Sequence, residues 1–237
     1  MISLRRAADR GATRLDWLDS RHAFSFGGYY DPRFTGFRNL LVINEDEVRP
    51  GAGFPTHPHR DMEIISYVID GGLAHRDSLG TGSIIRPGEI QRMSAGTGIR
   101  HSEFNASASE AVHFLQIWIR PERAGLAPGY EQAALPAVNG VSRLDLIGGR
   151  RGSDQAGGKQ TVTIHQDVAL WRASLQPGES MSLPLASGRA AWVQVVHGRA
   201  TVNGCAMAAG DGAAIEAESE VVMIGSEAAE LLVFDLP

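Results

Sequence analysis

Short runs of alternating or β-branched residues, each ending at glycine or another turn residue, dominate this sequence, and helical periodicity is hard to find. The runs occupy 40–48, 64–70, 113–119, 161–168 and 191–204. Strands of this length with turn signals between them are typical of a β-sandwich or a β-barrel. The 28 glycines and 11 prolines supply the many turns that such a fold needs. We therefore predict an all-β protein.

Two short segments favour a helix instead, RLDWLD at 14–19 and YEQAAL at 130–135. The dipeptide Asn203-Gly204 predicts a two-residue type I′ hairpin turn, which requires a positive φ at both positions.

The chain also shows a faint internal repeat. Tyr67-Val-Ile-Asp-Gly71 precedes a polar strand and Arg86-Pro-Gly-Glu89, and Gln194-Val-Val-His-Gly198 precedes a strand and Ala209-Gly-Asp211. Residues 121–160 interrupt the strand pattern with Gly, Pro and charge, and we place the boundary near 148–159. The sequence thus predicts a duplicated small barrel, with domains at 1–147 and 148–237.

Composition excludes several classes of protein. The single cysteine, Cys205, rules out an intramolecular disulfide and a cysteine-cluster metal site. No stretch approaches the roughly 18 apolar residues of a membrane span, and no secretory segment is seen. We therefore expect a cytoplasmic protein that does not bind membranes. The net charge of −5 opposes nucleic-acid binding, which requires a basic face.

The strongest local motif is His57-Pro58-His59, followed later by His101-Ser102-Glu103. Residues i and i+2 of a strand project from the same face, so each pair can present both side chains to one barrel interior. Three imidazoles and one carboxylate suit a divalent transition metal. One such pair arises by chance in many chains, but surface histidines have no reason to form two matched pairs.

Glu63 is a competing carboxylate. On one continuous strand it would lie ~13 Å from His59, too far to share a metal. We rank Glu103 ahead of it as a ligand and expect Glu63 to orient a histidine. The other five histidines have no partner of matching parity; they are His22, His75, His113, His165 and His197. Of these, we expect His113 and His165 to be structural.

Three apolar residues flank the ligands in sequence. Phe54, Met93 and Phe104 are candidates for an apolar slot that holds a planar aromatic, although the barrel core explains them better. Gly96-Thr-Gly98 lacks the spacing of a phosphate loop, and we expect it to shape the turn that aims His101.

Long, gapless blocks resemble a known family. GAGFPTHPHRDMEIISYV and RPGEIQRMSAGTGIRHSEFN are similar to the two signature blocks of the pirin family of bicupins. SRHAFSFGGYYDP and LQIWIRPERAGLAPGYEQ resemble flanking segments of its bacterial, quercetinase-type branch. The resemblance is strong over residues 1–135 and holds only at the level of fold beyond them. It implies two cupin barrels of the jelly-roll (double-stranded β-helix) type that face each other.

The resemblance also implies a metal centre and an activity. Carried over by position, the metal ligands are His57, His59, His101 and Glu103. One divalent ion per chain is expected, iron(II) first, with copper, zinc, nickel and manganese as alternatives. The implied enzyme is a quercetin 2,3-dioxygenase, which opens flavonols with O₂ and releases carbon monoxide. The metal would hold the deprotonated 3-hydroxyl, and Glu103 would be the catalytic base that takes its proton.

Two other functions stay open. Eukaryotic pirins are described as co-regulators, so a metal- or redox-responsive protein acting through protein partners is the main alternative. A cupin acting on an unrelated small molecule is the third.

The second cupin is expected to lack a metal. Aligning Gly71 with Gly198 and Gly88 with Gly210 gives the positions equivalent to the four ligands. These positions hold Pro184, Ala186, Met223 and Gly225. The only histidine between residues 171 and 237 is His197, so three imidazoles cannot assemble there.

Overall fold

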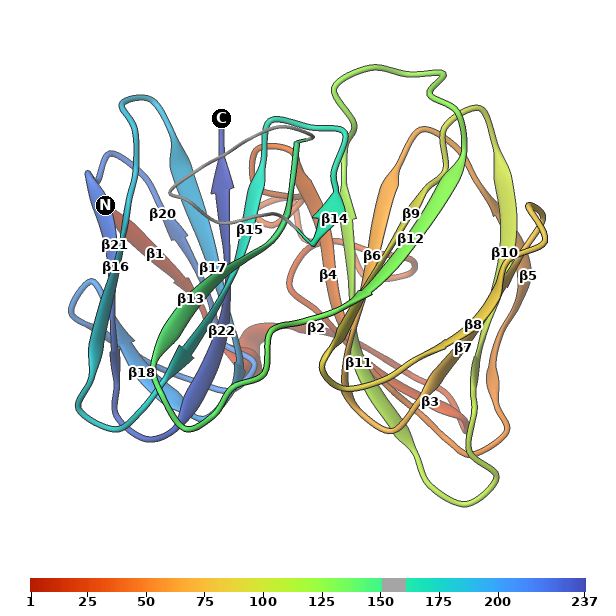
Figure 1. Cartoon of the computed structure of the whole chain (residues 1–237), viewed down its shortest axis with the longest axis horizontal. Coiled ribbons are helices and arrows are strands. Elements are labelled where there is room, and N and C mark those ends of the chain that lie inside the picture. The colour runs from red at the N-terminus through yellow and green to blue at the C-terminus, as the bar shows by residue number, and fades with distance from the viewer. Residues whose placement is uncertain (151–160) are drawn as a thin grey trace. The chain divides into compact units, whose positions relative to one another are not determined.

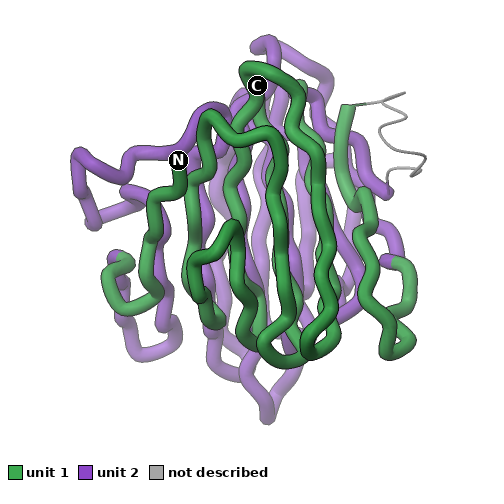
Figure 2. Tube along the Cα trace, turned by 90° about the vertical axis from the view of Figure 1, so that its left-hand side faces the viewer, with its two compact units in different colours: residues 1–10, 136–160, 167–237 green, residues 11–135, 161–166 purple. Residues whose placement is uncertain are grey.

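The computed structural model describes residues 1–150 and 161–237, which form two compact units of β-strands. Residues 11–135 and 161–166 form the unit called here the N-terminal barrel. Residues 1–10, 136–150 and 167–237 form the C-terminal barrel; Figure 2 shows the two units in different colours. Among the described residues the only helix is the 3-10 turn η1, Ala7–Asp9. The predicted all-β fold is confirmed.

The N-terminal barrel consists of two antiparallel sheets (Figure 1). The larger has the order β12-β9-β6-β11-β4-β3-β2 and the smaller the order β5-β10-β7-β8. Apolar side chains of both sheets, such as Phe114 and Leu73, meet in one core, so the sheets pack face to face. The strands are β2 (Gly11–Arg14), β3 (Leu18–His22), β4 (Leu40–Val48), β5 (Gly53–His59), β6 (Glu63–Asp70), β7 (Leu73–Asp77), β8 (Gly82–Ile85), β9 (Glu89–Ser94), β10 (Ile99–Asn105), β11 (Val112–Ile119), β12 (Gly129–Ala134) and β14 (Val162–Thr163).

The C-terminal barrel has the same construction. Its larger sheet contains β1-β20-β17-β22-β15-β13 in that order, and its smaller sheet is β16-β21-β18-β19. Residues of both sheets, including Val193 and Met223, share one apolar core. The strands are β1 (Ile2–Arg5), β13 (Arg143–Gly149), β15 (Ala169–Leu175), β16 (Ser180–Pro184), β17 (Ala190–His197), β18 (Arg199–Val202), β19 (Cys205–Ala208), β20 (Gly212–Ile215), β21 (Glu220–Gly225) and β22 (Ala229–Leu236).

The matching strand orders confirm the internal repeat. β9-β6-β11-β4 of one barrel correspond to β20-β17-β22-β15 of the other. The repeated turn glycines also share their conformation: φ is 79° at Gly71 and 75° at Gly198, and 82° at both Gly88 and Gly210.

The edge strand that flanks the repeated strands comes from a different part of the chain in each barrel. In the N-terminal barrel β12 pairs with β9, whereas in the C-terminal barrel β1 takes the corresponding place beside β20. The C-terminal barrel therefore includes the first residues of the chain. The boundary expected between residues 147 and 148 falls inside β13, and residues 151–159 of the expected boundary segment lie outside the described residues.

Both predicted helices are wrong. Residues 14–19 contain the end of β2 and the start of β3, and residues 130–135 lie largely in β12. Pairing with neighbouring strands overrides weak local helix propensity in both segments, as with Tyr130 opposite Met93.

Three other local predictions had mixed outcomes. The expected strand at 161–168 is limited to Val162–Thr163. The run at 191–204 is divided at Gly198 into β17 and β18. The type I′ turn is confirmed, because φ is 42° at Asn203 and 82° at Gly204, and Val202 pairs with Cys205.

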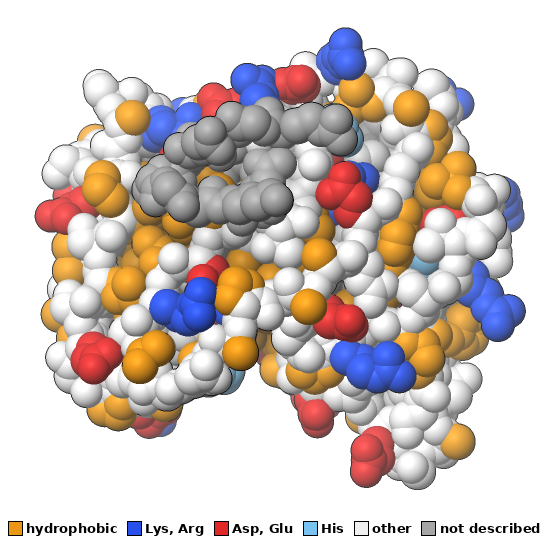
Figure 3. Space-filling model, in the orientation of Figure 1, with side chains coloured by type: hydrophobic (Ala, Val, Ile, Leu, Met, Phe, Trp, Pro, Cys, Tyr) orange, Lys and Arg blue, Asp and Glu red, His pale blue; other side chains and the backbone are white. Residues whose placement is uncertain are grey.

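Charged side chains of both signs are mixed on one face of the described chain. On the face of the described chain that Figure 3 shows, basic and acidic side chains are interspersed among apolar and uncharged ones. This distribution differs from the continuous basic face that nucleic acid selects. Among the described residues, no helix has the length and apolar character needed to cross a membrane.

Candidate metal centre

The predicted ligands lie on β5 and β10, neighbouring antiparallel strands of the smaller sheet in the N-terminal barrel. β5 is an edge strand, which explains how it tolerates Pro55 and Pro58: an edge strand has one side free of ladder hydrogen bonds. His57 and His59 alternate with Pro58, so both side chains leave the same face. His101 lies directly opposite His57 in the strand register.

The three imidazoles converge. The ring centroids of His57 and His101 are 4.5 Å apart, those of His57 and His59 are 4.7 Å apart, and those of His59 and His101 are 4.8 Å apart. Nε2 of His57 lies 3.1 Å from Nε2 of His101. The structure therefore brings the three predicted histidines into one group with metal-ligand spacing.

The protonation of these rings suits a cation. Burial, reinforced by the neighbouring imidazoles, lowers the pKa of His59 to about 4 and the pKa of His101 to about 3. Both rings are therefore neutral at pH 7, with a lone pair available for a metal. His57 donates from Nδ1 to the Pro55 carbonyl over 2.8 Å, which leaves its Nε2 lone pair facing the group. The donor set fits a divalent transition metal.

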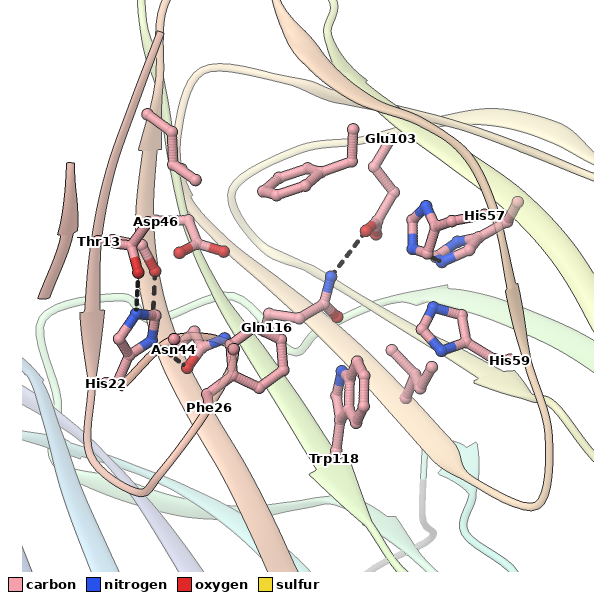
Figure 4. A pocket seen from close by; sticks show the side chains of 17 residues that line it. Thr13, His22, Phe26, Asn44, Asp46, His57, His59, Glu103, Gln116 and Trp118 are labelled. Carbon is pink, nitrogen blue, oxygen red and sulfur yellow. Dashed lines mark hydrogen bonds between the residues drawn. The ribbon is translucent and has the colours of Figure 1, made fainter. Parts of the chain in front are cut away.

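Glu103 lies two residues after His101 on β10 and is buried. Its carboxylate accepts a hydrogen bond from Ser66 Oγ over 3.1 Å. It accepts a second from Gln116 Nε2 over 2.7 Å, which Figure 4 shows. A carboxylate oxygen of Glu103 lies within 4.8 Å of ring nitrogens of His101 and His75, but Glu103 is not part of the three-histidine group. The structure thus places Glu103 beside His101 and does not join it with His57 and His59 in one group of four.

Sequence reasoning missed His75. This buried residue of β7 lies opposite Glu103 in the register, and its Nε2 is 3.0 Å from Asp77 Oδ2. With His101 and Glu103 it forms a second group with metal-ligand spacing. The signal in the sequence was the pair His75 and Asp77, two residues apart and therefore on one face of the strand.

Glu63 does contact a histidine, as expected, but this histidine is His165 and not a member of the cluster. Glu63 Oε2 accepts hydrogen bonds from the backbone N–H of His165 over 3.2 Å and from its ring Nδ1 over 3.1 Å. Arg92 Nε lies 3.9 Å from the same oxygen. The partly exposed His165 is thus held in place by the buried Glu63, in line with the structural role predicted for it.

A cavity of about 210 Å³ opens beside the histidines inside the N-terminal barrel (Figure 4). Aromatic rings form much of its wall. The Trp118 ring lies 5.0 Å from His59 and 5.4 Å from Phe26, and Phe54 packs edge-on against Trp17 at 5.1 Å. The cavity suits one small planar molecule.

The three residues weighed for an apolar slot have separate roles. Phe54 lines the cavity. Met93 is fully buried in a core cluster with Ile64 and Ile99, as the core interpretation predicted. Phe104 is 37% exposed because it leaves β10 on the face opposite His101 and Glu103. Phe26 and Trp118 were not foreseen as cavity residues.

The side of the cavity away from His57 and His59 is polar (Figure 4). His22 lies 2.9 Å through Nε2 from Thr13 Oγ1 and 2.8 Å through Nδ1 from Asn44 Oδ1. Asp46, two residues after Asn44 on β4, is also part of the lining. Desolvation by burial raises the pKa of Asp46 to about 7, and the charge of Glu103 adds to this effect, whereas a hydrogen bond with Ser20 opposes it.

The turn before β10 requires glycine. φ is 46° at Gly96 and 141° at Gly98. A Cβ at Gly96 would also clash with the carbonyl oxygen of Leu126. The expectation that this segment forms the turn leading to His101 is confirmed.

Comparisons with known proteins agree over the whole chain. Residues 4–119 match the family model described as Pirin, and residues 153–236 match the one described as Quercetinase C-terminal cupin domain. The sequence is 46% identical to a protein of Escherichia coli (strain K12) named quercetin 2,3-dioxygenase, with 100% of this chain and 99% of the relative covered.

Solved structures show the same likeness. The bacterial pirin YhhW from Escherichia coli in complex with nickel(II) has a TM-score of 0.92 at 44% identity, covering 100% of this chain and 99% of that chain. A quercetin 2,3-dioxygenase from Acinetobacter baumannii has a TM-score of 0.81 at 22% identity, covering 98% and 85%. The second comparison supports the fold alone.

Proposed function

The chain belongs to the pirin family, and from this premise we propose that it is a metal-dependent dioxygenase that opens flavonols such as quercetin with O₂. The observation that carries the proposal is the convergence of three imidazoles, two of them held neutral by burial, on the wall of an aromatic-lined cavity. Relatives named quercetin 2,3-dioxygenase support the choice of substrate.

We assign the ion to His57, His59, His101 and Glu103. A divalent ion bound there would act as Lewis acid and template for the deprotonated 3-hydroxyl of the flavonol. The nickel(II) complex of the Escherichia coli relative supports a divalent ion, and iron(II) remains the metal that we expect in the cell. Glu103 would join the histidines by a small movement of its side chain, since it lies beside His101 already.

Glu103 is also the proposed general base. Its carboxylate faces the cavity, and the hydrogen bonds from Ser66 and Gln116 fix its direction. A carboxylate held in this way can take the proton of the 3-hydroxyl when the flavonol enters.

The cavity wall would select the shape of the substrate. Phe26, Phe54 and Trp118 offer ring faces and edges to a flat aromatic molecule, and they exclude water from the neighbourhood of Glu103. In the overall reaction both atoms of O₂ enter the organic product, two carbon–carbon bonds of the central ring break, and the carbon between them leaves as carbon monoxide.

The test is turnover by metal-loaded protein. With iron(II), nickel(II) or copper(II) supplied in turn, quercetin absorbance should decay with uptake of one O₂ and release of one carbon monoxide per flavonol. Protein treated with chelator and the variant Glu103→Gln are the inactive controls. Gly82→Ala is the matched active control, because a Cβ at Gly82 meets no atom within 4 Å.

Protein that holds metal but leaves quercetin intact with every ion would contradict the proposed activity. That result would favour the alternative, a metal-responsive regulatory role through protein partners.

A further inference from the structure

Asp46 is a buried carboxyl without a structural counter-charge. It is 3% exposed and lies on β4 between Ser20 of β3 and Phe114 of β11 in the strand register. No described residue donates a hydrogen bond to its Oδ1. An unsatisfied buried polar atom costs about 1–3 kcal/mol, so its persistence calls for an explanation.

Ser20 forms one hydrogen bond with the Asp46 carboxyl, but the charged groups around it do not account for the unpaired Oδ1. The nearby carboxylates Glu103 and Glu45 disfavour its charge. The charge of His113 would favour ionised Asp46, but the Nε2 of His113 is hydrogen-bonded to Glu45 Oε1 over 2.9 Å. The carboxyl therefore gives up solvation without receiving an ion pair from the barrel.

The direction of the side chain supplies the explanation. Asp46 lines the same cavity as the histidine cluster, and Figure 4 shows its carboxyl directed inward from the side opposite His57 and His59. The ring nitrogens of His22 are already engaged by Thr13 and Asn44. Asp46 Oδ1 has no protein partner but is closed off in this structure, and rotation about the Cβ–Cγ bond, which is soft in Asp, would turn it toward a molecule in the cavity.

The walls between the two polar ends define what that molecule is. Phe26, Phe54 and Trp118 border the cavity, so the ligand that reaches from the histidines to Asp46 is a flat aromatic. Its metal-binding oxygens would lie at one end and a ring at the other. A carboxyl at that second end matches a phenolic hydroxyl, which can donate a hydrogen bond to Oδ1.

We propose that Asp46 is a specificity-determining residue that binds a hydroxyl group on the ring of the aromatic substrate remote from the metal-binding oxygens. This inference rests on the proposed function for the identity of the other end of the ligand. Flavonols hydroxylated on the remote ring would be preferred over those that lack these hydroxyls, because only they satisfy the buried carboxyl.

Binding without turnover tests this directly. Nickel-loaded protein is titrated without O₂ with quercetin, which carries two hydroxyls on the remote ring, and with galangin, which has none; quenching of tryptophan fluorescence gives Kd. Wild type should bind quercetin about tenfold more tightly than galangin. Asp46→Ala should weaken quercetin binding about tenfold, which is about 1.4 kcal/mol, and leave galangin binding unchanged. Asp46→Asn should keep part of the preference, because an amide also forms hydrogen bonds.

The matched control is Glu47→Ala, which removes an exposed carboxylate from the opposite face of the same strand. Metal content and melting temperature establish that each variant is folded. Equal losses for both flavonols, or no loss for either, would overturn the role of Asp46. If the protein turns over quercetin but binds quercetin and galangin equally well, the proposed function stands and the role of Asp46 is wrong. If it binds quercetin more tightly than galangin but turns over neither, the role of Asp46 stands and the proposed function is wrong.

Discussion

Gln116 Nε2 lies 2.7 Å from Glu103 Oε2, and this hydrogen bond joins the larger sheet of the N-terminal barrel, through β11, to the smaller sheet, through β10. Gln116→Leu removes the donor and leaves Ser66 as the remaining partner of the carboxylate. We expect quercetin turnover to fall about tenfold, the effect of losing one hydrogen bond to a charged group, while metal content changes little. Steady-state kinetics with elemental analysis of the same samples measures both. Unchanged turnover would mean that Glu103 needs no support from β11.

Replacing the proposed ligands separates metal binding from catalysis. Alanine at His57, His59 or His101 removes a nitrogen donor and should lower metal content sharply. Glu103→Gln keeps the shape of the side chain but removes the charge and the base, so activity should fall more than metal content does. Elemental analysis decides the outcome. Full occupancy in all four variants would show that the ion, if any, binds elsewhere.

The chain should bind one metal ion and not two. In the C-terminal barrel the corresponding strands β16 and β21 pair Met181 with Met223 and Leu183 with Val221, and none of these side chains can replace an imidazole as a ligand. Thioethers are poor ligands for hard or borderline divalent ions. Calorimetric titration of metal-free protein should give a stoichiometry near one. A tight site that survives in the double variant His57→Ala/His101→Ala would contradict this.

Gly53 sets the spacing between β5 and β10. A Cβ there would lie 2.5 Å from Phe104 Cα and closer still to the carbonyl oxygen of Glu103, both backbone atoms that cannot swing away. Gly53→Ala should therefore push β5 from β10, separate His57 from His101 and weaken metal binding at least tenfold. Gly82→Ala, with open space around its Cβ, should bind metal like wild type. Equal affinities in the two variants would show that the strands tolerate the added methyl.

Asp46 should make the stability of the metal-free protein depend on pH. Its folded pKa of about 7 exceeds the unfolded value of about 3.9, so the folded state holds an extra proton between these values. The free energy of unfolding contributed by this group therefore falls as pH rises from about 4 to 7. Asp46→Asn removes this contribution.

Urea denaturation at pH 5 and pH 8 measures the effect. Relative to wild type, Asp46→Asn should gain at least about 1 kcal/mol more at pH 8 than at pH 5, since one pKa unit corresponds to about 1.4 kcal/mol. The groups that act on Asp46 are Glu45 of its own strand and Ser20, Glu103 and His113 of other strands, and the variant leaves them all in place. A difference independent of pH would mean that the carboxyl is ionised in the folded protein.

Local patterns predicted much of this fold and site. The strand at 40–48 is found with those bounds, and the parity of His57 and His59 placed both rings on one face, because alternation along a strand needs no knowledge of its neighbours. The turn at Asn203-Gly204 was equally local. The predicted helices failed because the segments at 14–19 and 130–135 take their structure from strands far away in sequence.

The rest of the site depends on register across strands. His22, Asn44, Gln116 and Ser66 lie opposite one another on β3, β4, β11 and β6, and together they carry polar groups across the interior of the barrel. No local pattern shows which residues face each other in this way. Isolated polar residues within apolar strands, such as Gln116 in HFLQIWI, were nevertheless a visible signal.

The pairing of β1 with β20 has a consequence for how the protein is made. Ile2 lies opposite Ile215, so during synthesis β1 waits for a strand that emerges more than 200 residues later. The nascent chain can assemble most of the N-terminal barrel as soon as residue 135 is free. The C-terminal barrel can close only after β20 has emerged, and until then the N–H and C=O groups of Ile2–Arg5 have no strand to pair with. During synthesis β1 therefore stays an unpaired edge for longer than any strand of the N-terminal barrel.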